Sequence, residues 1–189
     1  MFNVKSLSDT KTIIKQNFNN YPLNEVSVKT VNSLGYIIAK DIFSKSDVPH
    51  FNRSTVDGYA VVYDDVKLAS ESSPAILNIV DEVFMGKKAP RDLTPTNAMI
   101  IPTGGHVPEG SDAIVMVENT QTLNDEVLIF KKVSKFENIV KIGSDIKKDN
   151  LFIKRNTIIT PTIIGALMSQ NIQDITCFQK LSATGISTG

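Results

Sequence analysis

Cysteine is nearly absent from this sequence: Cys177 is its one cysteine, so no intrachain disulfide can form. Histidine is scarce too. His50 and His106, together with that cysteine, are too few ligands for the usual closed zinc site. No apolar run approaches the roughly 20 residues that a membrane-spanning helix needs. The first ten residues lack the basic start and apolar stretch of a signal peptide. We therefore expect a cytoplasmic protein that does not bind a membrane.

An excess of charge of one sign is also missing, because 20 basic residues balance 20 acidic ones. This balance gives no electrostatic reason to expect binding to nucleic acid or to an anionic membrane. Hydrophobic residues make up 41% of the chain and charged residues 21%, which is ordinary for a globular protein. The length of 189 residues fits one large domain or two small ones.

The first part of the chain predicts two helices and a strand. Ser6 and Asp9 have the spacing of a capping box, with Asp in place of the usual Glu, and predict a short amphipathic helix. A second helix is expected after Ser27, with Gly35 as its C-terminal stop. The Ile-rich and aromatic segment 36–43 predicts a strand.

After Pro49 the chain consists of short β-prone runs separated by turn residues. The five runs are 60–63, 75–84, 98–101, 113–118 and 127–133. Asn124 and Asp125 predict a hairpin loop before the last run. Five short strands with turns between them predict a small β-domain over about 49–135.

The last part of the sequence is mixed again. Thr160-Pro161 predicts the start of a helix over 161–170, because proline is tolerated in the first helical turn. Residues 172–178 predict a strand, and 181–187 the beginning of another. Since the chain stops at what reads as a strand-to-loop transition, we expect it to be part of a longer protein.

The first group of residues suited to chemistry lies between His50 and Ala60. Asp57-Gly58 permits a tight turn, since glycine accepts positive φ without a Cβ clash. Arg53 and nearby hydroxyls can bind a phosphate, and Asp57 can bind a metal. The alternative is that Asp57 only organises a turn and Arg53 makes a surface ion pair. The residues alone favour that alternative.

The second group is Thr103-Gly104-Gly105, which follows a β-prone run. Two glycines allow close approach of the backbone, and exposed amides there can form an anion-binding nest. The Gly-Lys-Ser/Thr of a nucleotide-binding P-loop is missing, and the glycine spacing does not match a dinucleotide fingerprint. A plain turn between strands is the alternative, and the residues alone favour it. His106 has no identifiable partner, and Glu118 ends the next β-prone run.

Together these groups resemble the MoeA family of molybdopterin molybdenumtransferases, whose relatives include the gephyrin E domain. Residues 49–60 are similar to the family pattern Pro-x-Phe-x-x-Ser-x-x-Asp-Gly-Tyr-Ala. Residues 103–118 resemble Thr-Gly-x-x-x-Pro-x-Gly-x-Asp-Ala-Val-Val-x-x-Glu, with Ile114 and Val115 in the Val-Val places. Residues 143–146 match Gly-x-Asp-Ile, and 187–189 match a closing Ser-Thr-Gly. Four matches in the right order are more specific than any one of them.

The resemblance implies an α+β fold with several domains. Family members are elongated homodimers with four domains per subunit. The first domain, elongated and used for dimerisation, is expected from two segments, 1–48 and 136–176. The second is an inserted β-rich domain over 49–135. Residues 177–189 would be the truncated first strand of the third, an α/β domain that binds the pterin nucleotide.

The reaction that the resemblance implies is the insertion of molybdate into adenylylated molybdopterin, with release of AMP and assistance from Mg²⁺. Asp57 is expected to act in catalysis and to position a metal or water, and Thr103 to contact an oxyanion. The expected partners are a second copy of the chain and other proteins of molybdenum cofactor biosynthesis. The expected substrate-binding residues are Arg53, Ser54, Gly104, Gly105, Glu118, Ser144 and Asp145.

Two positions depart from the family pattern Arg-x-x-Gly-Glu-Asp-Ile. Val140 stands in place of an arginine, and Ser144 in place of a glutamate expected near a charged substrate. These departures leave open an alternative: a non-catalytic, MoeA-like module that binds the cofactor or organises partners.

Overall fold

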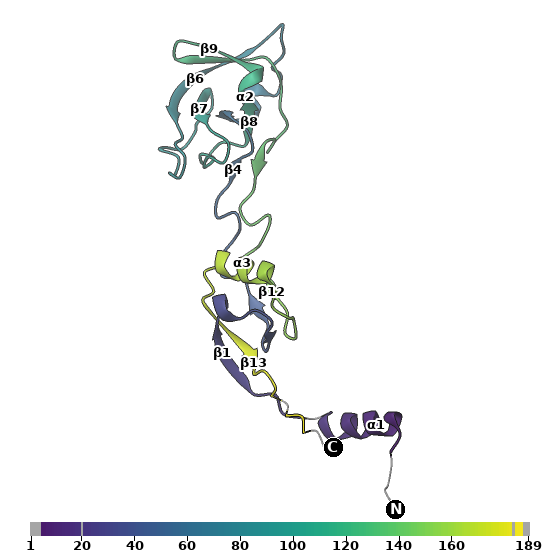
Figure 1. The fold of residues 1–189 in the computed structure, drawn as a ribbon. Helices are drawn as coiled ribbons and strands as arrows, with labels where there is room; N and C mark the ends of the chain where they lie inside the picture. Colours follow the sequence, from purple (N-terminus) through teal and green to yellow (C-terminus); the bar gives the residue numbers. More distant parts are fainter. Residues whose placement is uncertain (1–4, 20, 183, 187–189) are drawn as a thin grey trace, which may run out of the picture. The chain divides into compact units, whose positions relative to one another are not determined.

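The computed structural model describes residues 5–19, 21–182 and 184–186 and divides the chain into two compact units. Unit 1 comprises the described residues of Met1–Phe43 and Leu151–Gly189, and unit 2 comprises Ser44–Asn150. Unit 1 combines helices with short strands, whereas strands dominate unit 2 (Figure 1). The predicted α+β fold is confirmed.

The predicted N-terminal helix is present as α1 (Leu7–Phe18). Ser6 is its N-cap: the Ser6 hydroxyl accepts the Asp9 N–H, and the Asp9 carboxylate accepts the Ser6 N–H. This reciprocal pair is the capping box read from the sequence. The helix buries none of its residues.

The helix expected after Ser27 was wrong. Residues there form β1 (Glu25–Lys29), which is followed only by the 3-10 turn η1 (Thr30–Asn32). β1 pairs antiparallel with β13 (Asp174–Phe178), which in turn pairs with β2 (Ile37–Ile38). Alternate residues of β1 are half-buried, the period of a strand with one covered face. Its partner lies at the far end of the sequence, where a local pattern cannot reveal it.

The core of unit 1 lies between this sheet and α3 (Pro161–Ser169). Thr160 caps α3 by accepting the Ile163 N–H, so the predicted helix 161–170 is confirmed. A second small sheet pairs β3 (Ile42–Phe43) with β12 (Leu151–Ile153). The predicted strand 36–43 is therefore two short strands in different sheets. The buried cluster consists of Ile38, Ile159, Leu167, Ile172, Ile175 and Cys177.

Unit 2 is built around a six-stranded sheet with the strand order β8-β5-β7-β6-β10-β9. The sheet curls, because the Tyr59 hydroxyl on β5 lies 2.7 Å from the Thr122 Oγ1 on β9, four strands away in the sheet order. The strands of unit 2 are β4 (Arg53–Ser54), β5 (Gly58–Val61), β6 (Ala75–Glu82), β7 (Asn97–Ile101), β8 (Ala113–Met116), β9 (Thr120–Leu123), β10 (Glu126–Ile129) and β11 (Ile139–Val140), with short helices α2 (Tyr63–Val66) and η2 (Val117–Asn119).

All five predicted β-runs contain a strand, with ends displaced by a few residues. Asn124 and Asp125 do join two strands of a hairpin, and Asn124 has a positive φ of 55°. The first strand of that hairpin, β9, is polar and was not predicted. It is recognised only by its pairing with β10.

Both faces of the curled sheet are covered, because consecutive residues of β8 belong to different buried clusters. Val115 packs with Tyr59 and Val61, while Ile114 packs with Ala60 and Met99. Each fully buried aliphatic side chain contributes about 1.5–3 kcal/mol to folding. The strands β5 and β8 are thereby fixed on both faces, and the loops at their ends start from rigid positions.

The division into units differs from the predicted domain boundaries at 48/49 and 135/136. β11 pairs with β4, and the Gly143 N–H donates to the Pro49 carbonyl. These bonds keep residues 139–150 with the β-rich unit. The assignment of domains in the whole protein stays a prediction.

The expected strand at 181–187 is not found among residues 181–182 and 184–186. Cys177 and Phe178 belong to β13 and its sheet in unit 1, not to a separate C-terminal strand. Residues 183 and 187–189, with the Ser-Thr-Gly motif, lie outside the described residues.

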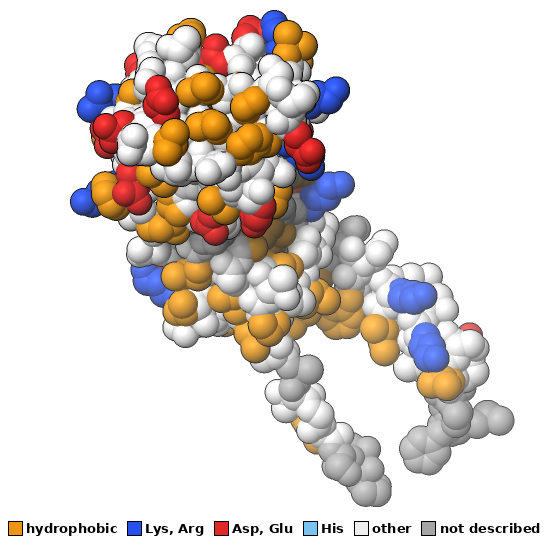
Figure 2. Space-filling view, turned by 90° about the horizontal axis from the view of Figure 1, so that it is seen from above, with side chains coloured by type: hydrophobic (Ala, Val, Ile, Leu, Met, Phe, Trp, Pro, Cys, Tyr) orange, Lys and Arg blue, Asp and Glu red, His pale blue; other side chains and the backbone are white. Residues whose placement is uncertain are grey.

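No helix within the described ranges is long and apolar enough to cross a membrane. In Figure 2, hydrophobic side chains gather on the end of unit 2 that carries β9 and β6, between acidic and basic groups. The large exposed hydrophobic residues of these two strands are Ile76 and Leu123.

Cys177 is buried, and burial raises the pKa of its thiol. Both effects lower the reactivity of the thiol, because the thiolate is the nucleophile and a raised pKa leaves less of it at a given pH. We expect a disulfide reagent at pH 8 to label the folded chain far more slowly than the chain unfolded in urea. Rapid labelling of the folded protein would contradict the placement of β13 in the core.

Candidate functional site

The two groups singled out in the sequence lie side by side in unit 2. The Ser54 N–H donates to the Gly105 carbonyl at 3.0 Å, and the Gly104 N–H donates to the Ser54 carbonyl at 2.8 Å. Further along, the Val107 N–H donates to the Asn52 carbonyl at 2.9 Å. On its other edge, β4 pairs with β11. Segments 103–107, 52–54 and 139–140 thus form a narrow ribbon.

Asp57 and Thr103 meet directly at one end of this ribbon. The Thr103 N–H donates to Asp57 Oδ1 at 2.7 Å, and both side chains are exposed. The Asp57 carbonyl also accepts the Val117 N–H at 3.1 Å. Asp57 therefore fixes the loop before β5 to the loops after β7 and β8. One carboxylate oxygen is used for this purpose, and no described residue donates a hydrogen bond to the other.

Ser54, expected to bind substrate, is placed inside the protein. It is 2% exposed, and its hydroxyl donates to the Val56 carbonyl and accepts the Val56 N–H. A serine bonded to the backbone two residues ahead stabilises a turn. Ser54 therefore shapes the loop that leads to Asp57, and its hydroxyl does not reach the surface.

The glycines form the plain turn that the residues alone favour, and not an anion-binding nest. The amides of Thr103, Gly104 and Gly105 donate to Asp57 Oδ1, the Ser54 carbonyl and the Pro102 carbonyl respectively. All three donors are consumed within the protein. Gly104 is required because its φ is +80°, and Gly105 because a Cβ there would lie 2.8 Å from the Pro102 oxygen. The glycines form a tight turn, and an anion has to be held by side chains.

Arg53 is exposed and makes no ion pair with any residue in the described ranges, so the alternative of a surface ion pair is not borne out there. It lies opposite His106 in the ribbon. The His106 ring stacks on Phe51, with ring centres 4.8 Å apart and planes 19° apart. The ring nitrogen Nδ1 lies 3.0 Å from the Val107 carbonyl. This partner of His106 could not be predicted from the sequence, because a cross-strand stack depends on a register that only pairing defines.

The third family motif lies in a separate turn of unit 2. The Asp145 N–H donates to the Val48 carbonyl at 2.9 Å, and the Ser144 hydroxyl donates to Asp145 Oδ1 at 3.1 Å. Both side chains are exposed. Val140, at the departure from the family pattern, pairs with Arg53. Among the described residues, no hydrogen bond joins this turn to Asp57 or Thr103.

Glu118 lies in η2, next to the residue whose amide binds the Asp57 carbonyl, and its side chain is exposed. The carboxylates do not combine into a metal site. In the described part of the chain, no group of three or more His, Cys, Asp or Glu side chains could hold a metal ion. Asp57 belongs to no such group among the described residues, and Mg²⁺ stays a prediction for the whole protein.

The candidate site is an exposed edge of unit 2. Two hollows, of about 550 and 760 Å³, are lined by residues of unit 1, and neither is lined by Asp57 or Thr103. Reactions at phosphate need a site from which water is largely excluded. The edge at Asp57 therefore requires a facing surface from outside unit 2 before it can act as an enclosed site.

Comparison with known proteins identifies related sequences. Residues 5–170 match the family model described as the MoeA N-terminal region, domains I and II. The chain is 34% identical over 190 aligned positions to a putative molybdopterin biosynthesis protein of Methanocaldococcus jannaschii, covering 99% of this chain and 46% of that protein. It is 31% identical to the molybdopterin molybdenumtransferase of Staphylococcus aureus, covering 87% of this chain and 39% of that enzyme.

Solved structures agree with these matches. A molybdopterin biosynthesis MoeA protein from Pyrococcus horikoshii superimposes with a TM-score of 0.82 at 31% identity, covering 94% of this chain and 45% of that chain. A second crystal structure of the MoeA protein from that organism gives a TM-score of 0.76 at 29% identity, covering 82% of this chain and 41% of that one. The chain thus spans less than half the length of these relatives.

Gly58 tests how tightly the Asp57 loop is held. A Cβ at this position would lie 1.9 Å from the Val115 carbonyl oxygen on β8, and a backbone atom cannot move away as a flexible side chain can. We expect Gly58→Ala to destabilise unit 2 by about 3 kcal/mol or more, measured by circular dichroism during urea unfolding.

The matched control for this substitution is Gly165→Ala in α3, where nothing lies within 4 Å of the added Cβ. Alanine is the better helix former by about 1 kcal/mol, so this variant should be as stable as the wild type or slightly more stable. Equal stability of Gly58→Ala and the wild type would show that β5 and β8 do not approach each other in this way.

Proposed function

Because the chain belongs to the MoeA family, of which it matches the N-terminal region, we propose that it supplies part of the active site of a molybdopterin molybdenumtransferase. The reaction is the insertion of molybdate into adenylylated molybdopterin, with cleavage of the pyrophosphate link and release of AMP. This proposal places the protein in molybdenum cofactor biosynthesis, as the names of its relatives suggest.

The observation that carries the proposal is the direct contact between Asp57 and Thr103. Two residues 46 positions apart in sequence, each within a family motif, meet at an exposed edge. Because the bond uses the Thr103 backbone amide, the Thr103 hydroxyl and Asp57 Oδ2 remain without a hydrogen-bond partner among the described residues. Arg53, which forms no ion pair with a described residue, lies on the same ribbon, and its positive charge suits an anionic substrate.

The two side chains have separate roles in this proposal. The Thr103 hydroxyl can donate a hydrogen bond to a phosphate or molybdate oxygen. Asp57 Oδ1 is occupied by the Thr103 amide, which leaves Oδ2 to accept a hydrogen bond from a water molecule and orient it towards phosphorus. Mg²⁺ stays a prediction for the whole protein, where Asp57 would supply one ligand.

Activity on this account requires protein beyond the present chain. The relatives are more than twice as long as the matched region, and the edge at Asp57 is open. We propose that a homodimer forms and that a domain outside this chain covers the edge. On its own, the 189-residue chain is expected to release no AMP from adenylylated molybdopterin.

A second candidate is a non-catalytic module that binds the cofactor or organises partners. Two observations favour it: Val140 and Ser144 depart from the family motif, and the described residues hold no complete metal site. The two candidates differ in turnover. The enzyme requires Asp57 for AMP release, whereas the module binds cofactor and shows no turnover in any longer protein that contains this region.

The test is Asp57→Asn in a longer protein that contains this region. The Asn side-chain oxygen can still accept the Thr103 N–H, so the loop keeps its shape while the negative charge is lost. We expect AMP release to fall about 100-fold or more, in the range for loss of an electrostatic catalytic contribution. The measurement is AMP formed from adenylylated molybdopterin and molybdate in the presence of Mg²⁺.

Glu126→Gln is the matched control, since it removes another exposed carboxylate of unit 2, on β10, that lies in none of the family motifs. If this variant loses as much activity as Asp57→Asn, the fall in AMP release comes from the loss of any surface negative charge and not from Asp57 in particular. Wild-type rates in Asp57→Asn would reduce Asp57 to a turn residue and favour the non-catalytic module.

The turn at Ser144 generates a separate prediction. The Ser144 hydroxyl donates to the Asp145 carboxylate, so the carboxylate of this motif comes from Asp145. If Asp145 contacts the substrate or its metal, Asp145→Asn should lower AMP release about 10-fold or more, while Ser144→Ala changes it little. A rise in activity in the double variant Val140→Arg with Ser144→Glu, with none lost in Asp145→Asn, would instead mean that the two departures weakened an ancestral site.

A further inference from the structure

The amides of the Thr103-Gly104-Gly105 turn are all bonded within the protein, so they cannot hold the anionic part of a substrate. Positive charge at this edge therefore has to come from side chains. Arg91 is paired with Asp81, and Lys135 with Asp112. Cations that make no ion pair within the described ranges are of greater interest, because they can be neutralised by a ligand.

Such cations occur in the turn that follows β6. This turn runs from Phe84 to Lys88 and is closed by the Lys87 N–H, which donates to the Phe84 carbonyl at 3.1 Å. Gly86 supplies the positive φ of 73° that the turn needs. Lys87 and Lys88 are exposed, and neither makes an ion pair with a described residue.

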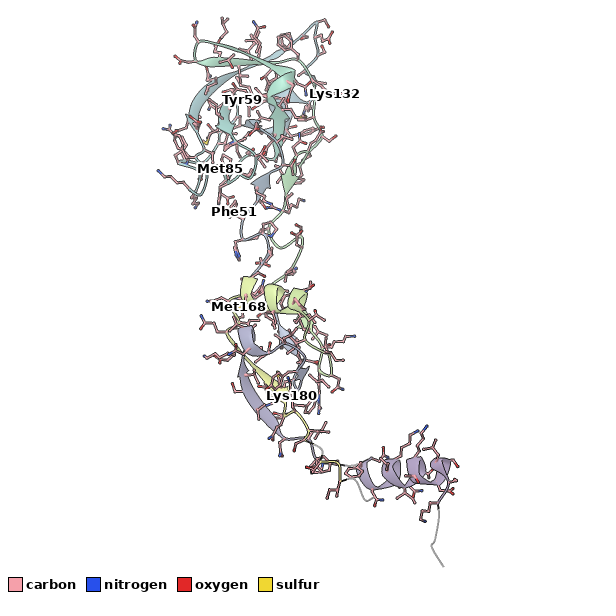
Figure 3. All side chains as sticks on the ribbon, in the orientation of Figure 1. Phe51, Tyr59, Met85, Lys132, Met168 and Lys180 are labelled. Carbon is pink, nitrogen blue, oxygen red and sulfur yellow. The ribbon has the colours of Figure 1, made fainter. Side chains whose placement is uncertain are left out.

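The turn lies against the Thr103 loop. A Cβ built on Gly104 would be 3.5 Å from the terminal methyl of Met85, which is an ordinary van der Waals contact. The Met85 methyl therefore lies beside the open face of Gly104, and the side chain as a whole is 64% exposed. Figure 3 shows Met85 and Phe51 towards the end of unit 2 that carries β4.

Lys87 belongs to the same turn, two residues after Met85. Its Nζ lies 5.8 Å from the centre of the Phe84 ring, within the range of a cation–π interaction. The ring orients the ammonium group without neutralising it. A side chain held in this way loses less rotational freedom when it binds an anion than a fully mobile lysine does.

We propose that the turn Phe84–Lys88 forms a second wall of the site, in which Lys87 binds an oxyanion of the substrate beside Thr103 and Gly104. The inference rests on the proposed function, which supplies the anion. The shared chemistry is a tetrahedral oxyanion, either the pyrophosphate of adenylylated molybdopterin or molybdate itself. Met85 contributes an apolar contact that limits the access of water to the bound anion.

The test measures binding to the 189-residue chain and does not depend on turnover. The ¹⁵N-labelled protein is titrated in one arm with ADP-ribose, which carries a pyrophosphate diester, and in another with molybdate. We expect the amide signals of Gly86, Thr103 and Gly104 to shift together. Lys87→Gln should weaken the binding of whichever ligand uses this site about 10-fold, the value of one hydrogen bond to a charged group.

The control variant is Lys132→Gln, since Lys132 is an exposed lysine of the same unit and lies on the other side of it from Met85 (Figure 3). It should bind both ligands as the wild type does, and Lys87→Arg should restore most of the affinity lost in Lys87→Gln. If Lys87→Gln loses affinity for ADP-ribose, the ligand of this site is the pyrophosphate. If it loses affinity for molybdate, the ligand is molybdate itself.

Two results would overturn the assignment. One is wild-type affinity for both ligands in Lys87→Gln. The other is no shift at Gly86, Thr103 and Gly104 with either ligand. Both leave the proposed function standing if Asp57→Asn still abolishes AMP release in the longer protein. Conversely, ligand binding that requires Lys87, without any Asp57-dependent turnover, would separate an oxyanion site from the proposed enzyme.

Discussion

The hydrogen bond from the Thr103 amide to the Asp57 carboxylate is the constraint on which the candidate site depends. It joins the loop before β5 to the loop after β7, and these strands are adjacent in the sheet. A charged acceptor makes such a bond stronger than a bond between neutral groups. One carboxylate oxygen, Oδ1, accepts this structural bond. The other, Oδ2, remains available to accept a hydrogen bond from water or to bind a ligand. The structural and chemical roles of Asp57 are therefore carried by different atoms of one side chain.

The rigid sheet behind the site makes this arrangement possible. β5 is paired on both edges and buried on both faces, and the missing Cβ of Gly58 permits its close approach to β8. Ser54 shapes the intervening loop from inside. What remains at the surface is a short row of side chains from two segments, with Arg53 and Asp57 on one and Thr103 on the other, and the Met85 turn beside them. Such an edge is open, which agrees with a site completed by protein from outside this chain.

The sequence predicted the chemistry of the site better than its contacts. Asp57 and Thr103 were selected from their motifs, and their proximity follows from pairing between segments 52–57 and 103–107. The role of Ser54 could not be predicted, because burial of a hydroxyl depends on that pairing. The glycine amides were assigned to an anion for the same reason. Likewise, the residues after Ser27 predict a helix. The partner that makes this segment the strand β1 is β13, more than 140 residues away, where a local pattern cannot reveal it. The Phe84–Lys88 turn carries no family motif, so the sequence does not predict a role for it. Its relation to the site follows from the position of Met85 beside Gly104.

Hydrogen exchange at the Thr103 amide tests the central claim most directly. The Thr103 side chain is exposed, so protection of its amide has to come from the hydrogen bond to Asp57. In the wild-type chain, measured by NMR, we predict slow exchange of this amide. Protection should be largely retained in Asp57→Asn, whose side-chain oxygen can accept the same bond, and lost in Asp57→Ala. Rapid exchange in the wild type, or equal protection in Asp57→Ala, would contradict the account and leave the two motifs without a physical link.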